Sequence, residues 1–364
     1  MDETINPFVT LKPTEERKGM SKMYFFINDY SEGAHAKVLQ ALTETNFEQT
    51  VGYGMDEYCA KAADLIRSKV ASPNSAVHFL VGGTQVNLTV LSAILRPYQA
   101  VIAAKTGHIF VHETGAIEAT GHKVLAVDTP DGKLTPKLIL PVVKGHPDEH
   151  MVQPKVVFIS DATEIGTLYT LAELTALSQF CQKYHLYLYL DGARLATALT
   201  GEGNDISLPD LARLTDVFYI GGTKNGALFG EALVINHPAL QKDFRYSIKQ
   251  RGGLLAKGRL LGLQFLALMQ DDLYFQIAAH ANQMAQRLQS GMAAQGYGFL
   301  THSATNQIFP IFPDALLPEL QSVCRFEVWG KADASHTVVR FVTSWATKEE
   351  TVEGFLHALA GFKV

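Results

Sequence analysis

Residues 219–230 read YIGGTKNGALFG and place one lysine, Lys224, among four glycines directly after an apolar run. Glycine has no Cβ, so a glycine-rich turn lets the backbone approach a ligand closely and adopt positive φ. A lysine in such a turn can serve as the partner of a phosphate or as a nucleophilic amine. The simpler alternative is a surface lysine in an ordinary turn.

The sequence on both sides of this turn alternates short apolar runs with stretches of helical spacing. Continuous apolar runs of this length predict parallel strands that are buried on both faces. The expected strands are 77–81, 100–104, 123–127, 156–159, 186–190, 217–220 and 232–235, and the expected helices include 88–95, 171–184 and 208–214. The pattern predicts an α/β fold with a mostly parallel, mixed sheet of seven strands.

The length of 364 residues predicts two domains, because a domain usually has roughly 100–200 residues. Strongly helix-forming sequence without strand alternation fills 238–295, and strand-like runs followed by an amphipathic helix come after it. We therefore expect an N-terminal arm (1–20), a large α/β domain (21–245), a long helical connector (246–290) and a small α+β domain (291–364).

The composition excludes several classes of protein. A net charge of −5 offers no basic field for nucleic acid, and no apolar run is long enough to cross a membrane. The N-terminus has no signal-peptide pattern. Cys59, Cys181 and Cys324 lie far apart, so we expect neither a disulfide framework nor a metal site, and a cytoplasmic location fits.

Gly82, Gly83 and Thr84 stand between an expected strand and an expected helix. Free N–H groups and a hydroxyl at a helix N-terminus form a site suited to a phosphate. A plain strand-to-helix turn is the alternative. The stretch has neither the GxxxxGK[ST] nor the GxGxxG spacing, so a nucleotide is not favoured.

Two further side chains follow expected strands, at the sheet edge where ligands of open α/β folds bind. Asp191 and Arg194 lie in LDGARL, and a buried carboxylate there needs a cationic or hydrogen-bonding partner, although it could also simply cap the next turn. His108 follows another strand, where an imidazole can stack on a ring and exchange protons, or be structural. Pyridoxal phosphate would satisfy the whole set: its aldehyde at Lys224, its ring nitrogen at Asp191 and its phosphate at Gly83 and Thr84.

Five stretches follow one another along the chain: GGT at 82–84, GHIFVHETGA at 107–116, DATEIGTLYTLAEL at 161–174, LDGARL at 190–195 and GGTKNGALFGEAL at 221–233. In this order they resemble the threonine aldolase branch of the β-eliminating lyase family, which consists of fold-type I pyridoxal phosphate enzymes. The resemblance runs from FFINDYSEGAHAKVLQAL at 25–42 through VGYGMDEY at 51–58 to RFVTSWAT at 340–347, nearly the whole chain.

The resemblance implies a role for each matching residue. Lys224 would form the covalent imine with the cofactor, Asp191 would hold the pyridinium and His108 would stack on the ring. The remaining residues that it assigns to the cofactor are Gly83, Thr84, Gln85, Arg194 and, more weakly and across a subunit interface, Lys257.

For the substrate, the resemblance implies that Arg194 and Arg340 bind the α-carboxylate. His150 matches a second active-site histidine and is a candidate for handling the β-hydroxyl proton. Tyr53 matches a residue supplied by the neighbouring subunit, and Asn28 stands where many relatives have a serine that contacts the carboxylate. The family forms dimers or tetramers, so we expect a homo-oligomer.

Two further departures bear on the reaction. Thr223 precedes the lysine where many threonine aldolases have serine, and SDATEIGTLY at 160–169 lacks the histidine of their Asn-Thr-His segment. The cofactor residues remain, whereas the substrate is left open among threonine, allo-threonine and phenylserine-like amino acids.

The activity implied is cleavage of the Cα–Cβ bond of a β-hydroxy-α-amino acid to glycine and an aldehyde. The nearest alternative is β-elimination or deamination of an amino acid with a leaving group at Cβ. Transamination, a non-catalytic pyridoxal phosphate-binding protein and a nucleotide-binding enzyme are less favoured alternatives.

Overall fold

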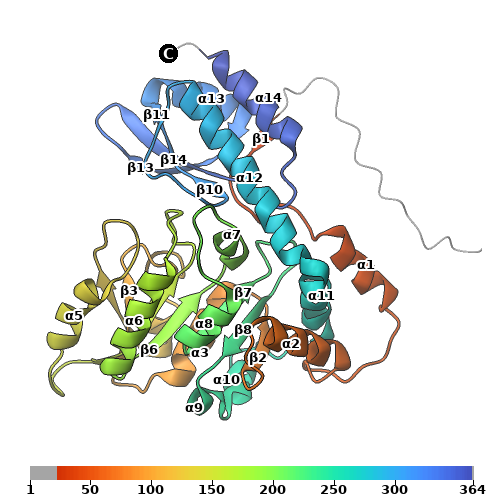
Figure 1. The fold of residues 1–364 in the computed structure, drawn as a ribbon, viewed down its shortest axis with the longest axis vertical. Coiled ribbons are helices and arrows are strands. Elements are labelled where there is room, and N and C mark those ends of the chain that lie inside the picture. The colour runs from red at the N-terminus through yellow and green to blue at the C-terminus, as the bar shows by residue number, and fades with distance from the viewer. Residues whose placement is uncertain (1–22, 363–364) are drawn as a thin grey trace, which may run out of the picture.

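The computed structural model describes residues 23–362, so the expected arm at 1–20 lies outside the described residues. A seven-stranded sheet forms the larger part of the molecule (Figure 1). Its strands, in spatial order, are β2 (Ala76–Leu80), β8 (Glu231–Ile235), β7 (Val217–Gly221), β6 (Tyr187–Asp191), β5 (Gln153–Ser160), β3 (Gln99–Ala104) and β4 (Lys123–Val127). β8 runs antiparallel to both of its neighbours, and all other pairs are parallel. The predicted mixed, mostly parallel α/β sheet is confirmed.

Both faces of this sheet are covered, which explains the continuous apolar runs. In β3, every residue is buried; Ile102 and Ala104 pack into one apolar cluster and Val101 and Ala103 into another on the opposite face. Successive side chains of a strand point to opposite faces, so a strand covered on both sides must be apolar throughout.

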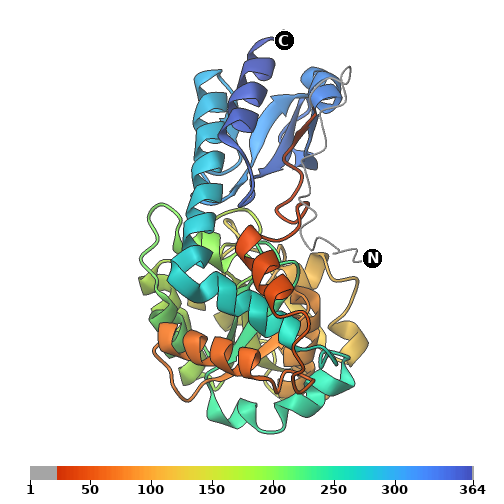
Figure 2. The same ribbon diagram turned by 90° about the vertical axis from the view of Figure 1, so that its right-hand side faces the viewer.

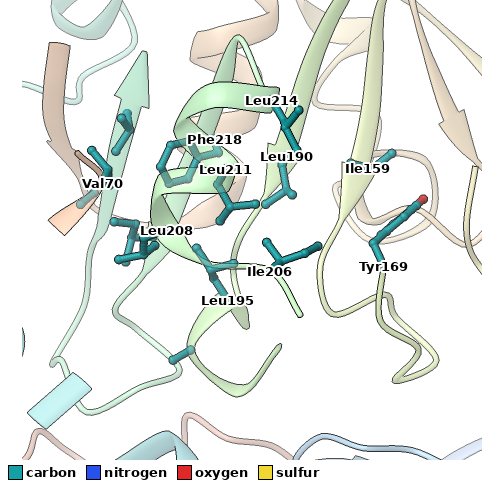
Figure 3. Close-up of a cluster of buried hydrophobic side chains, with 14 of the residues drawn as sticks. Val70, Ile159, Tyr169, Leu190, Leu195, Ile206, Leu208, Leu211, Leu214 and Phe218 are labelled. Atoms are coloured by element: carbon teal, nitrogen blue, oxygen red, sulfur yellow. The ribbon is translucent and has the colours of Figure 1, made fainter. Parts of the chain in front are cut away.

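Helices supply the two layers. On one face, α8 (Leu208–Leu214) lays Leu208, Leu211 and Leu214 against Phe218 of β7, as Figure 3 shows. The remaining helices of this larger part are α1 (Ala36–Glu44), α2 (Glu57–Lys69), α3 (Gly83–Ile94), α4 (His108–Val111), α5 (Pro136–Lys144), α6 (Leu171–Lys183), α7 (Leu195–Leu199) and α9 (Pro238–Gln241), with a 3₁₀ turn η1 (Glu118–Thr120).

The helix-rich stretch after β8 is not one connector. It forms α10 (Phe244–Gln250), α11 (Arg259–Met269) and α12 (Leu273–Ala294), with the 3₁₀ turn η2 (Gln270–Asp272) before α12. Asp271 and Asp272 have positive φ and stop the α-helical run. As Figure 1 shows, α11 lies beside α1 and α2, and only α12 continues into the upper part of the molecule.

The C-terminal part has its own sheet and its own core. β14 (His336–Val342) pairs with β10 (Gln307–Ile308), β11 (Pro310–Pro313) and β13 (Glu327–Lys331), and β9 (Gly298–Phe299) pairs with β11. α12 and α14 (Glu349–Ala360) pack against this sheet (Figure 2). The other elements here are η3 (Asp314–Leu316), α13 (Leu317–Val323) and β12 (Cys324–Arg325).

The first described residues belong to this C-terminal core rather than to the large sheet. β1 (Tyr24–Phe25) pairs in parallel with β12. The buried Phe26 ring stacks on Phe341 at 5.6 Å and meets Phe355 edge-on at 5.5 Å. The prediction that groups residues from 21 onward with the large domain is therefore wrong for this segment, because its apolar side chains complete the smaller core. The other expected domain limits stay predictions.

Within residues 23–362, no helix is long and apolar enough to cross a membrane, and no cluster of three or more potential metal ligands occurs. The three cysteines are free and buried.

Candidate active site

Lys224 follows β7 at the carboxyl edge of the large sheet. Gly222 and Thr223 both donate their backbone N–H groups to the carbonyl of Gly230, at 3.0 and 3.1 Å, which closes the turn. Gly226 adopts φ +86°, a conformation that favours glycine. The Lys224 side chain is only partly exposed, and none of the described residues hydrogen bonds to its Nζ. The turn therefore holds an amine that is free to meet a ligand.

The surroundings of Lys224 lower the pKa of its amine. Burial is the main cause and the Arg194 guanidinium adds to it, while the carboxylates of Asp29, Asp191 and Glu231 oppose the shift. Glu231 lies behind the turn and accepts the Gly222 N–H at 2.9 Å. Burial raises the pKa of Glu231 to about 7. The balance favours an amine that loses its proton more readily than a surface lysine does.

Asp191 ends β6 as a buried carboxylate with three hydrogen-bond donors. Its Oδ1 accepts hydrogen bonds from the Tyr219 hydroxyl at 2.5 Å and the Ala193 N–H at 3.0 Å, and its Oδ2 accepts from Asn87 Nδ2 at 3.2 Å. Gly192 is required here, because a Cβ at this position would lie 1.8 Å from the Tyr219 carbonyl oxygen. Such bonds compensate for much of the cost of burying the charge.

His108 begins α4 and is fixed by two acidic side chains. Its Nδ1 lies 2.9 Å from Glu113 Oε1, and its backbone N–H donates to Glu164 Oε1 at 3.0 Å. Asn87 Nδ2 also donates to Glu113 Oε1, at 2.7 Å. The Asn87 amide therefore contacts both Asp191 and Glu113, the residue that holds His108. Burial is the main reason that the pKa of Glu164 is raised.

The N-terminus of α3 lies beside this cluster. Gly82 is its N-cap and no side chain caps it, so the first N–H groups of a 12-residue helix are left for a ligand. A Cβ on Gly83 would lie 3.0 Å from the Tyr219 hydroxyl, which places this turn next to Asp191. Thr84 is exposed, whereas the Gln85 side chain bonds to the backbone of Val81 and Arg251.

Two arginines come from the two parts of the molecule: Arg194 follows β6 of the large sheet and Arg340 lies on β14. Arg194 forms a two-point ion pair with the buried Asp29, at 2.7 and 3.0 Å, and Asn306 donates to the same carboxylate at 2.9 Å. Arg340, on β14, pairs with Glu327 on β13 and lies over the Trp329 ring at 5.4 Å. Burial and then the charge of Arg194 lower the pKa of Arg340, as expected for neighbouring guanidinium groups.

Comparison with known proteins agrees with this geometry. The β-eliminating lyase family model matches residues 29–314. A low specificity L-threonine aldolase of Pseudomonas sp. (strain NCIMB 10558) is 34% identical over 332 residues, which cover 90% of this chain and 94% of that protein. A solved structure of Leishmania major threonine aldolase has 49% identity and a TM-score of 0.91, over 92% of this chain and 98% of that chain.

The chain belongs to the β-eliminating lyase family. The resemblance to the threonine aldolase branch is confirmed, as is the prediction of an enzyme of the lyase class. A Thermus thermophilus aspartate aminotransferase, at 16% identity and a TM-score of 0.71, shares the fold, which confirms the fold-type I prediction.

Not every expected site residue of this β-eliminating lyase joins the cluster. The His150 side chain is 86% exposed, contacts Asp148 at 3.1 Å and precedes the start of β5, at the opposite edge of the sheet from Asp191. His150 therefore does not lie with the Lys224 cluster of its own subunit, and its assignment to the β-hydroxyl proton stays a prediction. The Asn28 Oδ1 accepts hydrogen bonds from the Tyr30 N–H and the Ser31 hydroxyl, and its expected contact with the substrate carboxylate stays a prediction.

Tyr53 and Lys257 lie together but outside the Lys224 cluster. Tyr53 donates its N–H to Ala256 at 3.3 Å, and both side chains are exposed. Lys249 Nζ stands 4.5 Å from the centre of the Tyr53 ring. Their expected contribution to a neighbouring subunit stays a prediction.

The structure adds residues that the motifs alone did not single out. Asn87 and Tyr219 support Asp191, and Glu113 orients His108. Asn87 follows Gly83 by one helical turn and Glu113 follows His108 by five residues, so spacing from the predicted residues is the signal that could have found them.

Proposed function

We propose that this protein cleaves the Cα–Cβ bond of a β-hydroxy-α-amino acid, with pyridoxal phosphate as cofactor, and releases glycine and an aldehyde. The observation that carries the proposal is the juxtaposition of a free lysine amine, a hydrogen-bonded buried carboxylate and an uncapped helix N-terminus at one sheet edge. The threonine aldolases that the chain resembles support the same reaction.

The donor and acceptor groups fit this cofactor. The uncapped start of α3, at Gly83 and Thr84, would take the phosphate, and Asp191 would take the protonated ring nitrogen. His108, held by Glu113, would lie against the ring. When bound, pyridoxal phosphate supplies an aldehyde for a covalent link to Lys224 and a ring that withdraws electrons.

The residues of the chain contribute binding and proton control. A lowered pKa leaves more of the Lys224 amine unprotonated, which favours its action as a nucleophile. Tyr219, Asn87 and the Ala193 N–H stabilise the charged form of Asp191.

Arg194 and Arg340 are the proposed ligands of the substrate carboxylate. Among the described residues, Arg340 Nε has no hydrogen-bond partner, which leaves a buried donor for an anion. Arg194 is already oriented by Asp29, so little side-chain freedom would be lost on binding.

A second candidate, β-elimination, is favoured by the match to the β-eliminating lyase family model. The products separate the two reactions. We expect purified protein loaded with pyridoxal phosphate to release glycine and an aldehyde from threonine, allo-threonine or phenylserine. An α-keto acid with ammonia, and no glycine, would support elimination instead.

The Lys224→Ala variant tests the covalent link. We expect it to lose the visible absorbance of bound pyridoxal phosphate, because no other amine in the described residues occupies this turn. Lys137→Ala, on the exposed side of α5, is the control and should keep the spectrum. An unchanged spectrum in Lys224→Ala would remove the lysine from its assigned role.

We also propose a homo-oligomer in which Tyr53 and Lys257 reach the site of a neighbouring subunit. Both are exposed in the isolated chain, as a cross-subunit role requires. Light scattering that gives a mass near 39.9 kDa, the mass of one chain, would contradict this proposal. A cytoplasmic location stays a prediction from the three unpaired cysteines.

A further inference from the structure

Asn87 is a buried amide that contacts two carboxyl groups of the site at once. It lies on α3, one helical turn after Gly83, and is fully buried. Its Nδ2 donates to Asp191 Oδ2 at 3.2 Å and to Glu113 Oε1 at 2.7 Å. One amide nitrogen therefore joins the carboxylate that ends β6 to the carboxylate that holds His108 on α4.

The orientation of the Asn87 amide is fixed by its partners. Ionised carboxylates only accept hydrogen bonds, so the NH₂ group must face Asp191 and Glu113. On its other side, Asn87 Oδ1 accepts a hydrogen bond from the Tyr189 hydroxyl at 2.6 Å. Burial, and then the charges of Asp191 and Glu113, raise the pKa of Tyr189 well above its usual value, so this hydroxyl keeps its proton and remains a donor.

One oxygen of Asp191 has room for a further donor. Oδ1 already accepts two hydrogen bonds, from the Tyr219 hydroxyl and the Ala193 N–H. Among the described residues, only Asn87 donates to Oδ2, and its bond is the longest of the three. Each carboxylate oxygen offers two lone pairs, so the protonated ring nitrogen of the cofactor would bind Oδ2, beside the Asn87 amide.

The same hydrogen bonds define the state of the His108 ring. The Glu113 side chain is fully buried, and its Oε1 accepts the Asn87 N–H and lies 2.9 Å from His108 Nδ1. Nδ1 is therefore the protonated nitrogen that donates to the carboxylate. None of the described residues hydrogen bonds to Nε2, which is left for a ligand.

We propose that Asn87 is a positioning residue that aligns the two groups assigned to the cofactor ring. This inference rests on the proposed function. Asn87 holds Asp191 Oδ2 for the ring nitrogen and, through Glu113, holds the His108 imidazole that would lie against the ring face. Because one amide serves both carboxylates, neither can shift without changing its bond to Asn87. The contact with the ring nitrogen and the contact with the ring face are therefore linked.

Cofactor affinity tests this role. Asn87→Ala removes both bonds to charged groups, so we expect the cofactor-free variant to bind pyridoxal phosphate about 10–100-fold more weakly in an absorbance titration. Thr89→Val is the matched control. Thr89 lies on the same helix and is equally buried, and its hydroxyl has no partner among the described residues, so this variant should bind like wild type. Wild-type affinity in Asn87→Ala would overturn the proposal.

Tyr189→Phe is a milder variant that carries the same test if Asn87→Ala does not fold. It removes only the hydroxyl that orients the amide and keeps the ring that packs edge-on against Phe158. We expect it to weaken binding of pyridoxal phosphate about 2–10-fold. Affinity equal to that of wild type in this variant would show that the amide needs no orientation, against the proposal.

A cofactor analogue with carbon in place of the ring nitrogen separates positioning from a purely structural role. Wild-type protein should prefer pyridoxal phosphate to this deaza analogue, because only pyridoxal phosphate can donate a hydrogen bond to Asp191. We expect the preference, measured as the ratio of the two Kd values, to shrink about tenfold in Asn87→Ala and to be unchanged in Thr89→Val. An equal loss of affinity for both compounds would mean that Asn87 only supports the fold.

A double-mutant cycle tests the link to His108. His108→Phe keeps an aromatic ring but has no Nδ1 for Glu113 to hold. We expect Asn87→Ala to weaken cofactor binding less in the His108→Phe background than in the wild-type background, because part of its effect passes through His108. Independent, multiplicative effects of the two substitutions would overturn the linked role.

A failure of the proposed function has a different signature. Wild-type protein that binds pyridoxal phosphate but cleaves no β-hydroxy amino acid would contradict the proposed reaction. The three measurements on Asn87 all follow cofactor binding, so they decide its role whichever reaction the loaded protein performs.

Discussion

Buried carboxyl groups define the site at the scale of single residues, and they differ in how well they are satisfied. Asp191 has three hydrogen-bond donors. Asp161, at the next strand end, has one donor on Oδ1, the Tyr169 N–H at 3.3 Å, and its buried Oδ2 has no partner among the described residues. Burial therefore raises the pKa of Asp161 from 3.8 to about 7.

Asp161→Asn should stabilise the protein at alkaline pH. The native state holds the Asp161 proton up to about pH 7, whereas an unfolded chain releases it near pH 3.8. Wild-type stability therefore falls as pH rises through this window. We expect the cofactor-free variant to be more stable at pH 8 by about 2–4 kcal/mol, with the difference shrinking toward pH 4 in urea unfolding. Parallel stability curves for the two proteins would contradict the raised pKa.

Glu231→Gln should change the titration of Lys224. The Glu231 carboxylate raises the pKa of the Lys224 amine, and Glu231 becomes charged near pH 7. Above pH 7, removal of this negative charge should therefore lower the pKa of Lys224 further. The rate at which Lys224 is acylated in cofactor-free protein, followed by mass spectrometry against pH, measures the effect. An unchanged or higher pKa would show that the two groups do not interact.

At the scale of elements, the helix N-termini differ in whether a side chain caps them. α3 begins at Gly82 without a side-chain cap and leaves its N–H groups open. α6, away from the site, begins with a complete capping box between Thr170 and Glu173. A helix that serves a ligand leaves its N-terminus unsatisfied, whereas a structural helix satisfies it from its own sequence.

Thr170→Ala should cost about 1 kcal/mol of unfolding free energy, because the Glu173 N–H loses its acceptor. Thr175→Ala, inside the same helix, is the control. The Thr175 hydroxyl only bonds back to the Leu171 carbonyl, and alanine favours a helix more than threonine does. Equal destabilisation by both substitutions would show that the capping box contributes nothing.

At the scale of the whole molecule, one carboxylate joins three distant segments. Asp29 precedes α1, Arg194 follows β6 and Asn306 precedes β10 of the C-terminal sheet. Burial on its own would raise the pKa of Asp29, but Arg194, Lys224 and the hydrogen bonds from Arg194 and Asn306 lower it overall.

Asp29→Asn should destabilise the fold by about 3 kcal/mol at neutral pH, because it leaves Arg194 buried without a counter-ion. The lowered pKa of Asp29 stabilises the folded protein above pH 3.8, and this stability is lost as pH falls through the native pKa of Asp29. The difference in stability between the variant and the wild type should therefore shrink in acid. Asp64→Asn removes an exposed ion pair with Arg67 and should cost less than about 1 kcal/mol. Equal effects of the two substitutions in chemical unfolding would contradict the anchoring role of Asp29.

Local sequence predicts the strands and the chemistry that follows them. The runs at 100–104 and at 217–220 correspond to most of β3 and of β7, because a strand covered on both faces must be apolar throughout. Lys224, Asp191 and His108 follow such strands, and strand ends of a parallel sheet meet at one edge. The family motifs then imply the reaction.

Only the tertiary structure decides what depends on segments far apart in the chain. No local pattern separates His108, whose ring is held by the buried Glu113, from His150, whose side chain is left in solvent. Likewise, Phe26 packs against Phe341 and not against the large sheet. Secondary structure follows from interactions between near neighbours, whereas burial, charge and the reach of a side chain depend on what the folded chain places beside it.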